Sequence, residues 1–188
     1  MKWISGITLF LSIWGWGCEM TQAAEPRLGS PFKQWCLWRE SLSDEAQKTV
    51  EVLLEKAGTS DCEQASVNLS SRTELNLYGN QIKDVTPLSG LTNLTELNLG
   101  ENQIKNVNPI SGLTNLNSLS LSENQIKDIS PLSELTNLNS LFLENNPIAQ
   151  QTCPVSPPSV CDYCLCSSLS GKYLIICLSV FTRRKIKG

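Results

Sequence analysis

A fixed internal period constrains this chain more than any other feature. The segment Asn-Gln-Ile-Lys begins at Asn80, Asn102 and Asn124, so each copy starts 22 residues after the one before. The segment Leu-Thr-Asn-Leu recurs with the same spacing. A constant period of this length is typical of a solenoid, in which each repeat packs only against its neighbours. The sequence therefore predicts a stack of similar turns over the middle of the chain.

Leucines at alternate positions mark the inward side of each turn. This alternation predicts a short strand whose leucines join one core shared by parallel neighbours. The leucines are Leu75, Leu77, Leu97, Leu99, Leu119, Leu121, Leu141 and Leu143. An asparagine follows each strand, where its amide can bond backbone groups of stacked copies. The four are Asn80, Asn102, Asn124 and Asn146. The proline in Thr86-Pro87-Leu88 favours a 3₁₀ or single-turn element on the return path.

The unit L-x-x-L-x-L-x-x-N-x-I is the leucine-rich repeat pattern. From about Leu69 to Ile148 it resembles the 22-residue repeats of the internalin family of bacterial surface proteins. The resemblance implies an α/β solenoid, namely a short right-handed leucine-rich repeat with a parallel sheet on its concave side. It also implies protein binding on that concave face. We find no immunoglobulin-like domain after the repeats and no LPxTG motif, so adhesion and invasion roles are not carried over.

The first residues read as a secretory signal. Lys2 precedes an uncharged apolar run from Trp3 to Gly17, and Thr21-Gln22-Ala23 offers small residues for cleavage after Ala23. Two alternatives stay open. The segment could remain as a membrane anchor, or Cys18 could carry a lipid. The leading prediction is a secreted, periplasmic or cell-surface protein, with membrane anchoring as the alternative.

The eight cysteines suit an exported chain, because disulfides persist outside the cytosol. Cys36 and Cys62 precede the repeats, and Cys153 and Cys161 follow them. Open solenoid ends need caps, and of the three possible pairings the local ones, Cys36–Cys62 and Cys153–Cys161, are favoured. A helix beginning after Ser43 and ending at Gly58 is predicted for the N-terminal cap, with a second short helix near Asp61.

The helix after Ser43 has an apolar face that we expect to cover the first repeat. Its members are Leu42, Ala46, Val50, Leu53, Leu54 and Ala57.

We divide the chain into a signal peptide (1–23), an N-terminal cap (30–70), the repeats (71–148), a C-terminal cap (149–161) and a tail (162–188). The tail has an apolar run, then basic residues, and resembles a short anchor, but the run is about half the ~20 residues that span a bilayer. The alternative is a degenerate extension, and the pairing of Cys164, Cys166 and Cys177 stays open.

Composition excludes several function classes. The formal net charge is −3 and the pI is about 5.1, so the chain has no basic footprint for nucleic acid. Histidine is absent, which removes Ser-His-Asp and Cys-His catalysis and the commonest zinc ligand. We therefore predict a non-enzyme with no catalytic residues, no cofactor and no metal. The C-x-x-C-x-C cluster in the tail lacks the second pair that a zinc site needs.

Residues beside the inward leucines should face outward on the concave side. One column holds Glu74, Glu96, Ser118 and Ser140, the next Asn76, Asn98, Ser120 and Phe142, and the third Tyr78, Gly100, Ser122 and Glu144. The predicted binding residues are Glu74, Asn76, Tyr78, Glu96, Asn98, Ser120, Phe142 and Glu144. The alternative for the two aromatics is that Tyr78 packs on the N-terminal cap and Phe142 on the C-terminal one.

Two further patterns have structural interpretations. Glu74 and Glu96 resemble a carboxylate pair, but parallel strands place them side by side in any case, so a solvated acidic face is favoured over general acid–base chemistry. Lys83, Lys105 and Lys127 form a row that we interpret as solvated charge. The leading functional prediction is a binding module for an unknown protein or peptide. The alternatives are an envelope-associated structural protein whose tail contacts the membrane, and an enzyme or inhibitor on this scaffold.

Overall fold

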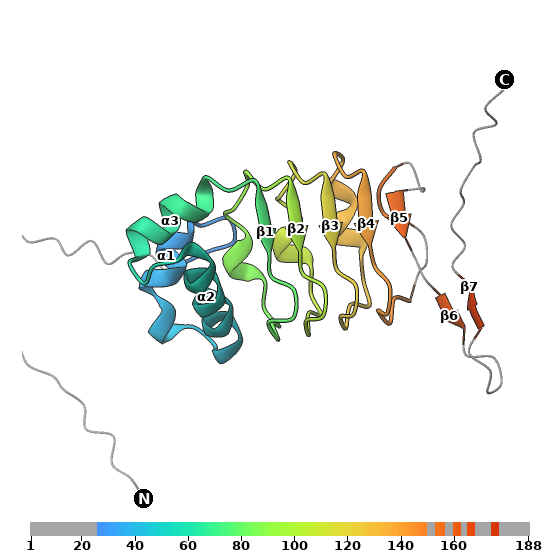
Figure 1. Ribbon diagram of the computed structural model, residues 1–188, viewed down its shortest axis with the longest axis horizontal. Helices are drawn as coiled ribbons and strands as arrows, with labels where there is room; N and C mark the ends of the chain where they lie inside the picture. The colour runs from blue at the N-terminus through green and yellow to red at the C-terminus, as the bar shows by residue number, and fades with distance from the viewer. Residues whose placement is uncertain (1–25, 150–152, 157–159, 163–164, 168–173, 177–188) are drawn as a thin grey trace, which may run out of the picture.

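The chain folds into a short solenoid capped by helices at its N-terminal end (Figure 1). A computed structural model describes residues 26–149, 153–156, 160–162, 165–167 and 174–176. The main sheet has five parallel strands in the order β1-β2-β3-β4-β5. They are β1 (Glu74–Asn76), β2 (Glu96–Asn98), β3 (Ser118–Ser120), β4 (Ser140–Phe142) and β5 (Cys161–Asp162). The predicted α/β leucine-rich solenoid with a parallel sheet is confirmed.

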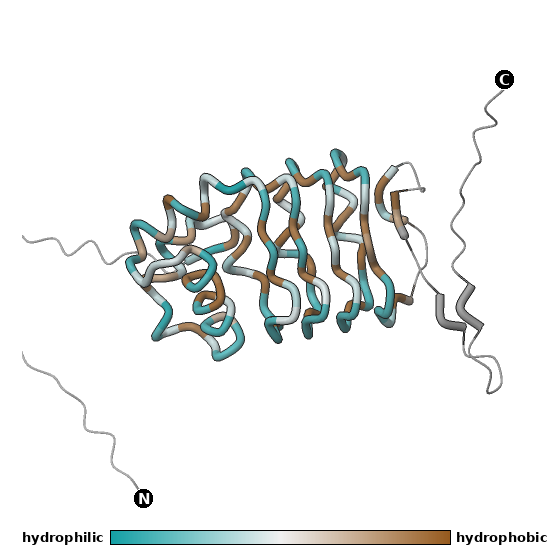
Figure 2. The backbone as a smooth tube through the Cα atoms, in the orientation of Figure 1, coloured by the Kyte–Doolittle hydropathy of each residue, from teal (hydrophilic) through white to brown (hydrophobic). Residues whose placement is uncertain are grey.

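The core is a stack of leucines in strict register. Leu75 pairs with Leu97, Leu97 with Leu119, and Leu119 with Leu141 across the sheet. These side chains and the second leucine of each turn are buried in one continuous cluster. Figure 2 shows the apolar residues recurring at the same level in successive turns. Because the alternate inward positions at each strand are leucine, the outward residues between them are held in equally regular rows.

The return path of each turn contains a 3₁₀ helix, as the proline predicted. The three are η2 (Thr86–Leu88), η3 (Asn108–Ile110) and η4 (Ser130–Glu134), each with proline near its start. At each helix start a side-chain oxygen two residues earlier accepts a backbone N–H: Asp84 accepts from Thr86, Asn106 from Asn108 and Asp128 from Ser130. Two hydrogen bonds from Ser130 lower the pKa of Asp128. The bond from the Ser130 backbone N–H has the larger effect, and the bond from its hydroxyl has the smaller one.

Asparagine side chains tie each turn to the one before it. Asn124 Nδ2 donates to the carbonyls of Leu99, Leu121 and Ser122 at 2.9, 2.9 and 3.1 Å, while its Oδ1 accepts the Ile104 N–H at 3.0 Å. Asn102 and Asn146 repeat this arrangement. The predicted ladder is therefore present. Asn80 opens the series with no earlier turn to bridge, and its Nδ2 donates only to the Tyr78 carbonyl.

Replacing a ladder asparagine should cost far more inside the stack than at its start. Asn124→Ala would leave three carbonyls and one N–H without this partner in a site that is only 6% exposed. We expect a loss of about 2–4 kcal/mol in unfolding free energy. Asn80→Ala removes one side-chain donor at a partly exposed site and should cost below about 1 kcal/mol. Denaturant unfolding of both variants measures the difference, and equal losses would contradict it.

Three helices cover the N-terminal end of the stack. They are α1 (Phe32–Leu37), α2 (Asp44–Ala57) and α3 (Cys62–Ser70), with a 3₁₀ turn, η1 (Arg39–Ser41), between the first two. Ser43 caps α2 by accepting from Ala46 N–H, Gly58 ends it at φ 73°, and Asp61 caps α3. The buried hydroxyl of Thr49 donates to the Asp84 carbonyl at 2.6 Å, which attaches α2 to the first repeat.

The sequence located α2 and α3 but missed α1. That helix has six residues and no side-chain N-cap, so nothing local marks its start. Two members of the predicted face of α2, Leu42 and Leu54, are only partly buried. Val52 and Thr49 are buried instead, since α2 contacts both α3 and η2 rather than the repeat alone.

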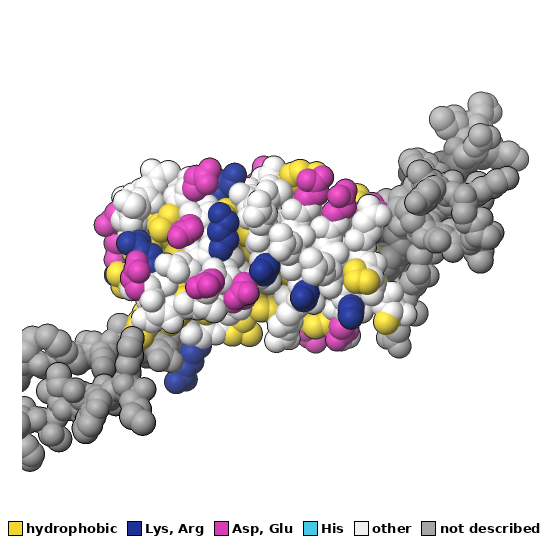
Figure 3. Space-filling model, turned by 90° about the horizontal axis from the view of Figure 1, so that it is seen from below, with side chains coloured by type: hydrophobic (Ala, Val, Ile, Leu, Met, Phe, Trp, Pro, Cys, Tyr) yellow, Lys and Arg dark blue, Asp and Glu magenta, His cyan; other side chains and the backbone are white. Residues whose placement is uncertain are grey.

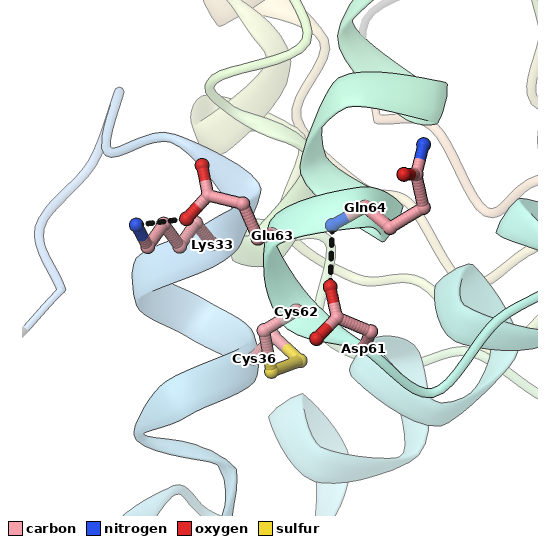
Figure 4. Close-up of polar contacts among 6 residues, drawn as sticks. All are labelled: Lys33, Cys36, Asp61, Cys62, Glu63 and Gln64. Atoms are coloured by element: carbon pink, nitrogen blue, oxygen red, sulfur yellow. Dashed lines mark hydrogen bonds and ion pairs between the residues drawn. A yellow bond between two sulfur atoms is a disulfide. The ribbon is translucent and has the colours of Figure 1, made fainter.

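Both ends of the repeats carry the disulfides that the sequence favoured. Cys36 on α1 bonds to Cys62 at the start of α3, and Figure 4 shows this bond beside the ion pair of Lys33 with Glu63 and the Asp61 cap on Gln64. Cys153 bonds to Cys161 in β5. Val155 and Val160, between these two cysteines, are buried and close the other end.

The signal peptide predicted for residues 1–23 lies outside the described residues, as do Cys18, Cys164 and Cys177. In the tail, β6 (Leu165–Ser167) pairs with β7 (Leu174–Ile176) in antiparallel register. Within the described ranges, no helix has the length and apolar character needed to cross a bilayer.

The segment before α1 packs tightly on the convex side of the first repeat. Gly29 N–H donates to the Ser89 hydroxyl at 2.8 Å, and a Cβ added at Gly90 would lie 2.3 Å from the Ser30 carbonyl oxygen. Gly112 occupies the same repeat position one turn later and has open space around it. The glycine at position 90 is therefore required by this close approach.

This contrast predicts unequal effects of one substitution at two equivalent positions. Gly90→Ala should lower the unfolding free energy by about 1–3 kcal/mol, because backbone must move to admit the methyl group. Gly112→Ala should be neutral or stabilising by up to about 1 kcal/mol. Thermal or denaturant unfolding tests both, and a harmless Gly90→Ala would mean that the segment before α1 does not pack here.

Candidate binding face

The outward residues of the strands form two straight rows across the sheet. Glu74 is paired in register with Glu96, Glu96 with Ser118, and Ser118 with Ser140. The second row follows the same pairing and consists of Asn76, Asn98, Ser120 and Phe142. Adjacent strands lie about 4.8 Å apart, so each row is a regular array on a rigid backbone.

A shallow groove of about 580 Å³ lies over these rows. Its polar and aromatic lining consists of Glu74, Asn76, Glu96, Asn98, Ser118, Ser120, Ser122, Phe142 and Glu144. Seven of the eight residues chosen from the sequence are in this list, and Tyr78 is not. The strands therefore bring together most of the predicted set in one hollow on the sheet.

Tyr78 lies at the rim of the groove, where its side chain packs against the next repeat. A Cβ added at Gly100 would be 3.1 Å from the Tyr78 ring, and the Tyr78 hydroxyl donates to the Glu101 carboxylate. The alternative in which Tyr78 packs on the N-terminal cap is therefore wrong. Glycine at position 100 leaves room for the ring, whereas Ser122 and Glu144 occupy the same position in later turns. The Tyr78 side chain is still 50% exposed.

Phe142 ends the second row and is 37% exposed. It lines the groove, and its backbone is paired with Ser120 on one side and Asp162 of β5 on the other. Nearby, the Ser122 hydroxyl donates to the Glu144 carboxylate. This corner of the groove thus combines an apolar surface with a carboxylate.

The Glu74–Glu96 pair has the geometry of neighbours rather than of catalytic partners. Both side chains are exposed, and the structure assigns neither of them a hydrogen-bond or ion-pair partner among the described residues. A general acid of the kind that works beside a second carboxylate is normally shielded by apolar groups. Such shielding is missing at these two positions.

The lysine row lies on a different edge from the groove. Lys83, Lys105 and Lys127 are exposed, and Lys83 approaches Glu45 of α2 at 3.9 Å. Figure 3, viewed from below, shows a row of basic side chains running along the solenoid. These lysines provide control positions that share the repeat but not the groove.

A second ladder of asparagine amides was not predicted from the sequence. Asn115 and Asn137 donate to the carbonyls of Thr92 and Thr114 in the preceding turn at 2.8–2.9 Å, and Asn93 donates to the carbonyl of Ser70 at the end of α3 at 2.8 Å. The recurring Leu-Thr-Asn-Leu segment was the available signal. These bonds fix the approach to each strand, so the strand is held at both of its ends.

Residues 73–112 and 114–153 match the family described as leucine rich repeats in two copies. With the register and the amide ladders described above, this match confirms the leucine-rich repeats that the sequence predicted. No curated protein matches the chain. In the described part of the chain, no cluster of three or more potential metal ligands is present.

Several solved structures are similar to the chain. Internalin C2 from Listeria monocytogenes is 36% identical, with a TM-score of 0.44, covering 52% of this chain and 52% of that protein. Another internalin of that organism is 34% identical, with a TM-score of 0.44, covering 57% of this chain and 33% of that one. A leucine-rich repeat protein of Leptospira interrogans is 33% identical, with a TM-score of 0.41, covering 45% and 22%. The chain thus matches about half of the first protein and less of the others.

The rim contact of Tyr78 predicts a specific titration. Its hydrogen bond to the Glu101 carboxylate is the main cause that raises the pKa of Tyr78 from 10.0 to about 12. Since the folded pKa lies above the unfolded one, the contribution to stability is complete below pH 10.0 and is lost as pH rises towards 12. Phenolate absorbance of the wild type minus that of Tyr78→Phe measures this group alone. Glu101→Gln should return its pKa towards 10.0, and an unchanged titration would show that the contact does not form.

Proposed function

We propose that this chain is a secreted or surface-exposed binding module that recognises a protein or peptide through the groove over β1–β4. The observation that carries the proposal is the groove itself, which is lined by outward side chains from four consecutive strands. Binding to such an array needs little ordering of the protein, because the leucine core and the asparagine ladders already hold each strand. Leucine-rich repeats in general support a protein-binding role.

The proposed contacts fall into three parts of this face. Phe142 and the rim residue Tyr78 are the aromatic anchors, a residue class enriched at binding hot spots. Asn76, Asn98 and Ser120 supply hydrogen bonds at the centre. Glu74, Glu96 and Glu144 supply charge selectivity.

The proposed location outside the cytoplasm rests on two independent features. One is the pair of disulfides at the ends of the repeats, which persist in oxidising compartments. The other is the apolar N-terminal segment of the sequence. We propose the division into signal (1–23), caps (30–70 and 149–161), repeats (71–148) and tail (162–188) on the same basis.

Two alternatives compete with the binding module. A structural envelope protein would be retained in membranes through its tail, which fractionation of the culture would detect. An enzyme on this scaffold would need a reactive group in a shielded pocket, and the carboxylates of Glu74 and Glu96 are exposed. The binding module accounts for the groove, the exposed aromatics and the rigid strand array together.

Site-specific photo-crosslinking tests which face is used. A photoreactive amino acid at Ser120 lies in the groove, whereas one at Lys105 lies on the lysine edge of the same repeat. After incubation with proteins of the native extracellular surroundings, we expect a defined partner to be captured from position 120 and not from 105. Capture from position 105 alone would overturn the proposal.

Substitutions should then identify the anchors of any captured partner. Phe142→Ala and Tyr78→Ala should each weaken its affinity by about tenfold, the usual effect of losing an aromatic hot spot. Lys105→Ala should change the affinity little, because this side chain is exposed on another edge. Titration calorimetry with unfolding curves for each variant separates affinity from folding. Equal affinity of all three variants would exclude this face as the site.

A further inference from the structure

The groove carries charge of one sign only. Three carboxylates line it, from Glu74, Glu96 and Glu144, and its lining contains neither lysine nor arginine. The ion pairs of the described residues are Lys33–Glu63, Arg39–Glu40 and Lys83–Glu45, and none of them involves a groove residue. The groove is therefore an acidic surface whose charges are not neutralised by the described part of the chain.

The fold does not require these acids. Like charges directly opposite each other on adjacent strands destabilise a sheet, and Glu74 is paired with Glu96 in register. The same row continues with Ser118 and Ser140, so a neutral residue fits this position equally well. The sheet therefore does not explain the two carboxylates, and a partner with positive charge would offset their repulsion.

The charges occupy opposite corners of the groove. Glu74 and Glu96 begin β1 and β2, whereas Glu144 follows β4, two residues after Phe142, and both of these residues line the groove. From strand spacings of ~4.8 Å and a rise of ~3.3 Å per residue, the two corners are on the order of 15–20 Å apart. Between them the lining is neutral, with Asn98, Ser118 and Ser120. An extended peptide of about five or six residues covers that distance.

We propose that the groove binds an extended cationic segment of a protein, with basic residues about five positions apart and an apolar residue next to the second of them. This inference rests on the proposed function and specifies the chemistry of its partner. One basic residue meets the Glu74–Glu96 pair and relieves the repulsion between the two carboxylates. The other pairs with Glu144 while the apolar neighbour packs on Phe142. Small polar residues fit over the serine and asparagine centre.

Selection from a random peptide library tests the proposal with a defined probe. Displayed peptides are panned against the purified full chain, and the enriched sequences are synthesised and titrated. We expect enrichment in Lys and Arg at the stated spacing and an affinity that falls as salt rises. The groove variant Glu74→Gln/Glu96→Gln/Glu144→Gln should weaken binding by about tenfold, since the attraction of three carboxylates for the basic residues is lost.

A matched variant controls for net charge. Glu51→Gln/Glu55→Gln/Glu134→Gln removes three exposed carboxylates on α2 and η4, away from the groove lining, and should leave the affinity unchanged. Glu96→Gln alone should also raise the unfolding temperature slightly, because it removes the repulsion across β1–β2.

The outcomes separate this inference from the proposed function. Peptides without an excess of basic residues, or equal losses in the two triple variants, would overturn the cationic segment. If such peptides still lose affinity when Phe142 becomes Ala, the groove binds peptides and only the charge assignment fails. A library that yields no binder overturns the cationic segment, and the crosslinks from position 120 then decide the proposed function independently.

Discussion

The side-chain amide that follows each strand is the interaction on which the rest of this structure depends. A strand of three residues cannot stabilise itself, and a turn of 22 residues leaves many backbone groups inside the stack. Asn102, Asn124 and Asn146 each satisfy carbonyls of two successive turns and at least one N–H. Buried backbone groups need such partners. The leucine core provides the attraction between turns, but the amides set the register in which they stack, and the groove exists only because that register is constant.

Keeping this register imposes a backbone cost next to the groove. Gly79, Glu101, Glu123 and Asn145 occupy equivalent positions with φ between 51° and 71°. Glycine and asparagine adopt this left-handed conformation readily, whereas glutamate does so at a cost of about 1 kcal/mol or more. The N–H groups of the first three donate to carbonyls of the next turn. The stacked hydrogen bonds hold the two glutamates there, which is how Glu101 comes to lie within reach of the Tyr78 hydroxyl.

The period made the sheet, its register and the two outward rows predictable, because inward leucines at alternate positions leave the side chains between them only one side to face. The cap helices α2 and α3 had visible signals in Ser43, Asp61 and Gly58. Contacts between non-equivalent positions were not predictable. The packing of Gly90 on Ser30 depends on where the chain before α1 lies, and the place of Tyr78 depends on a missing side chain at Gly100. Both arise where one turn departs from the pattern of the others.

Such departures also occur on the face that we propose for binding. Over four turns the two alternate inward positions at each strand keep leucine, and all eight side chains are buried in the shared core. The outward rows change from glutamate to serine and from asparagine to phenylalanine over the same four turns. The strand pairing is the same in each of these turns, so the pairing does not account for the differences. A ligand that lies across the strands meets each copy once, and it can therefore require acid at one end of the groove and an aromatic ring at the other.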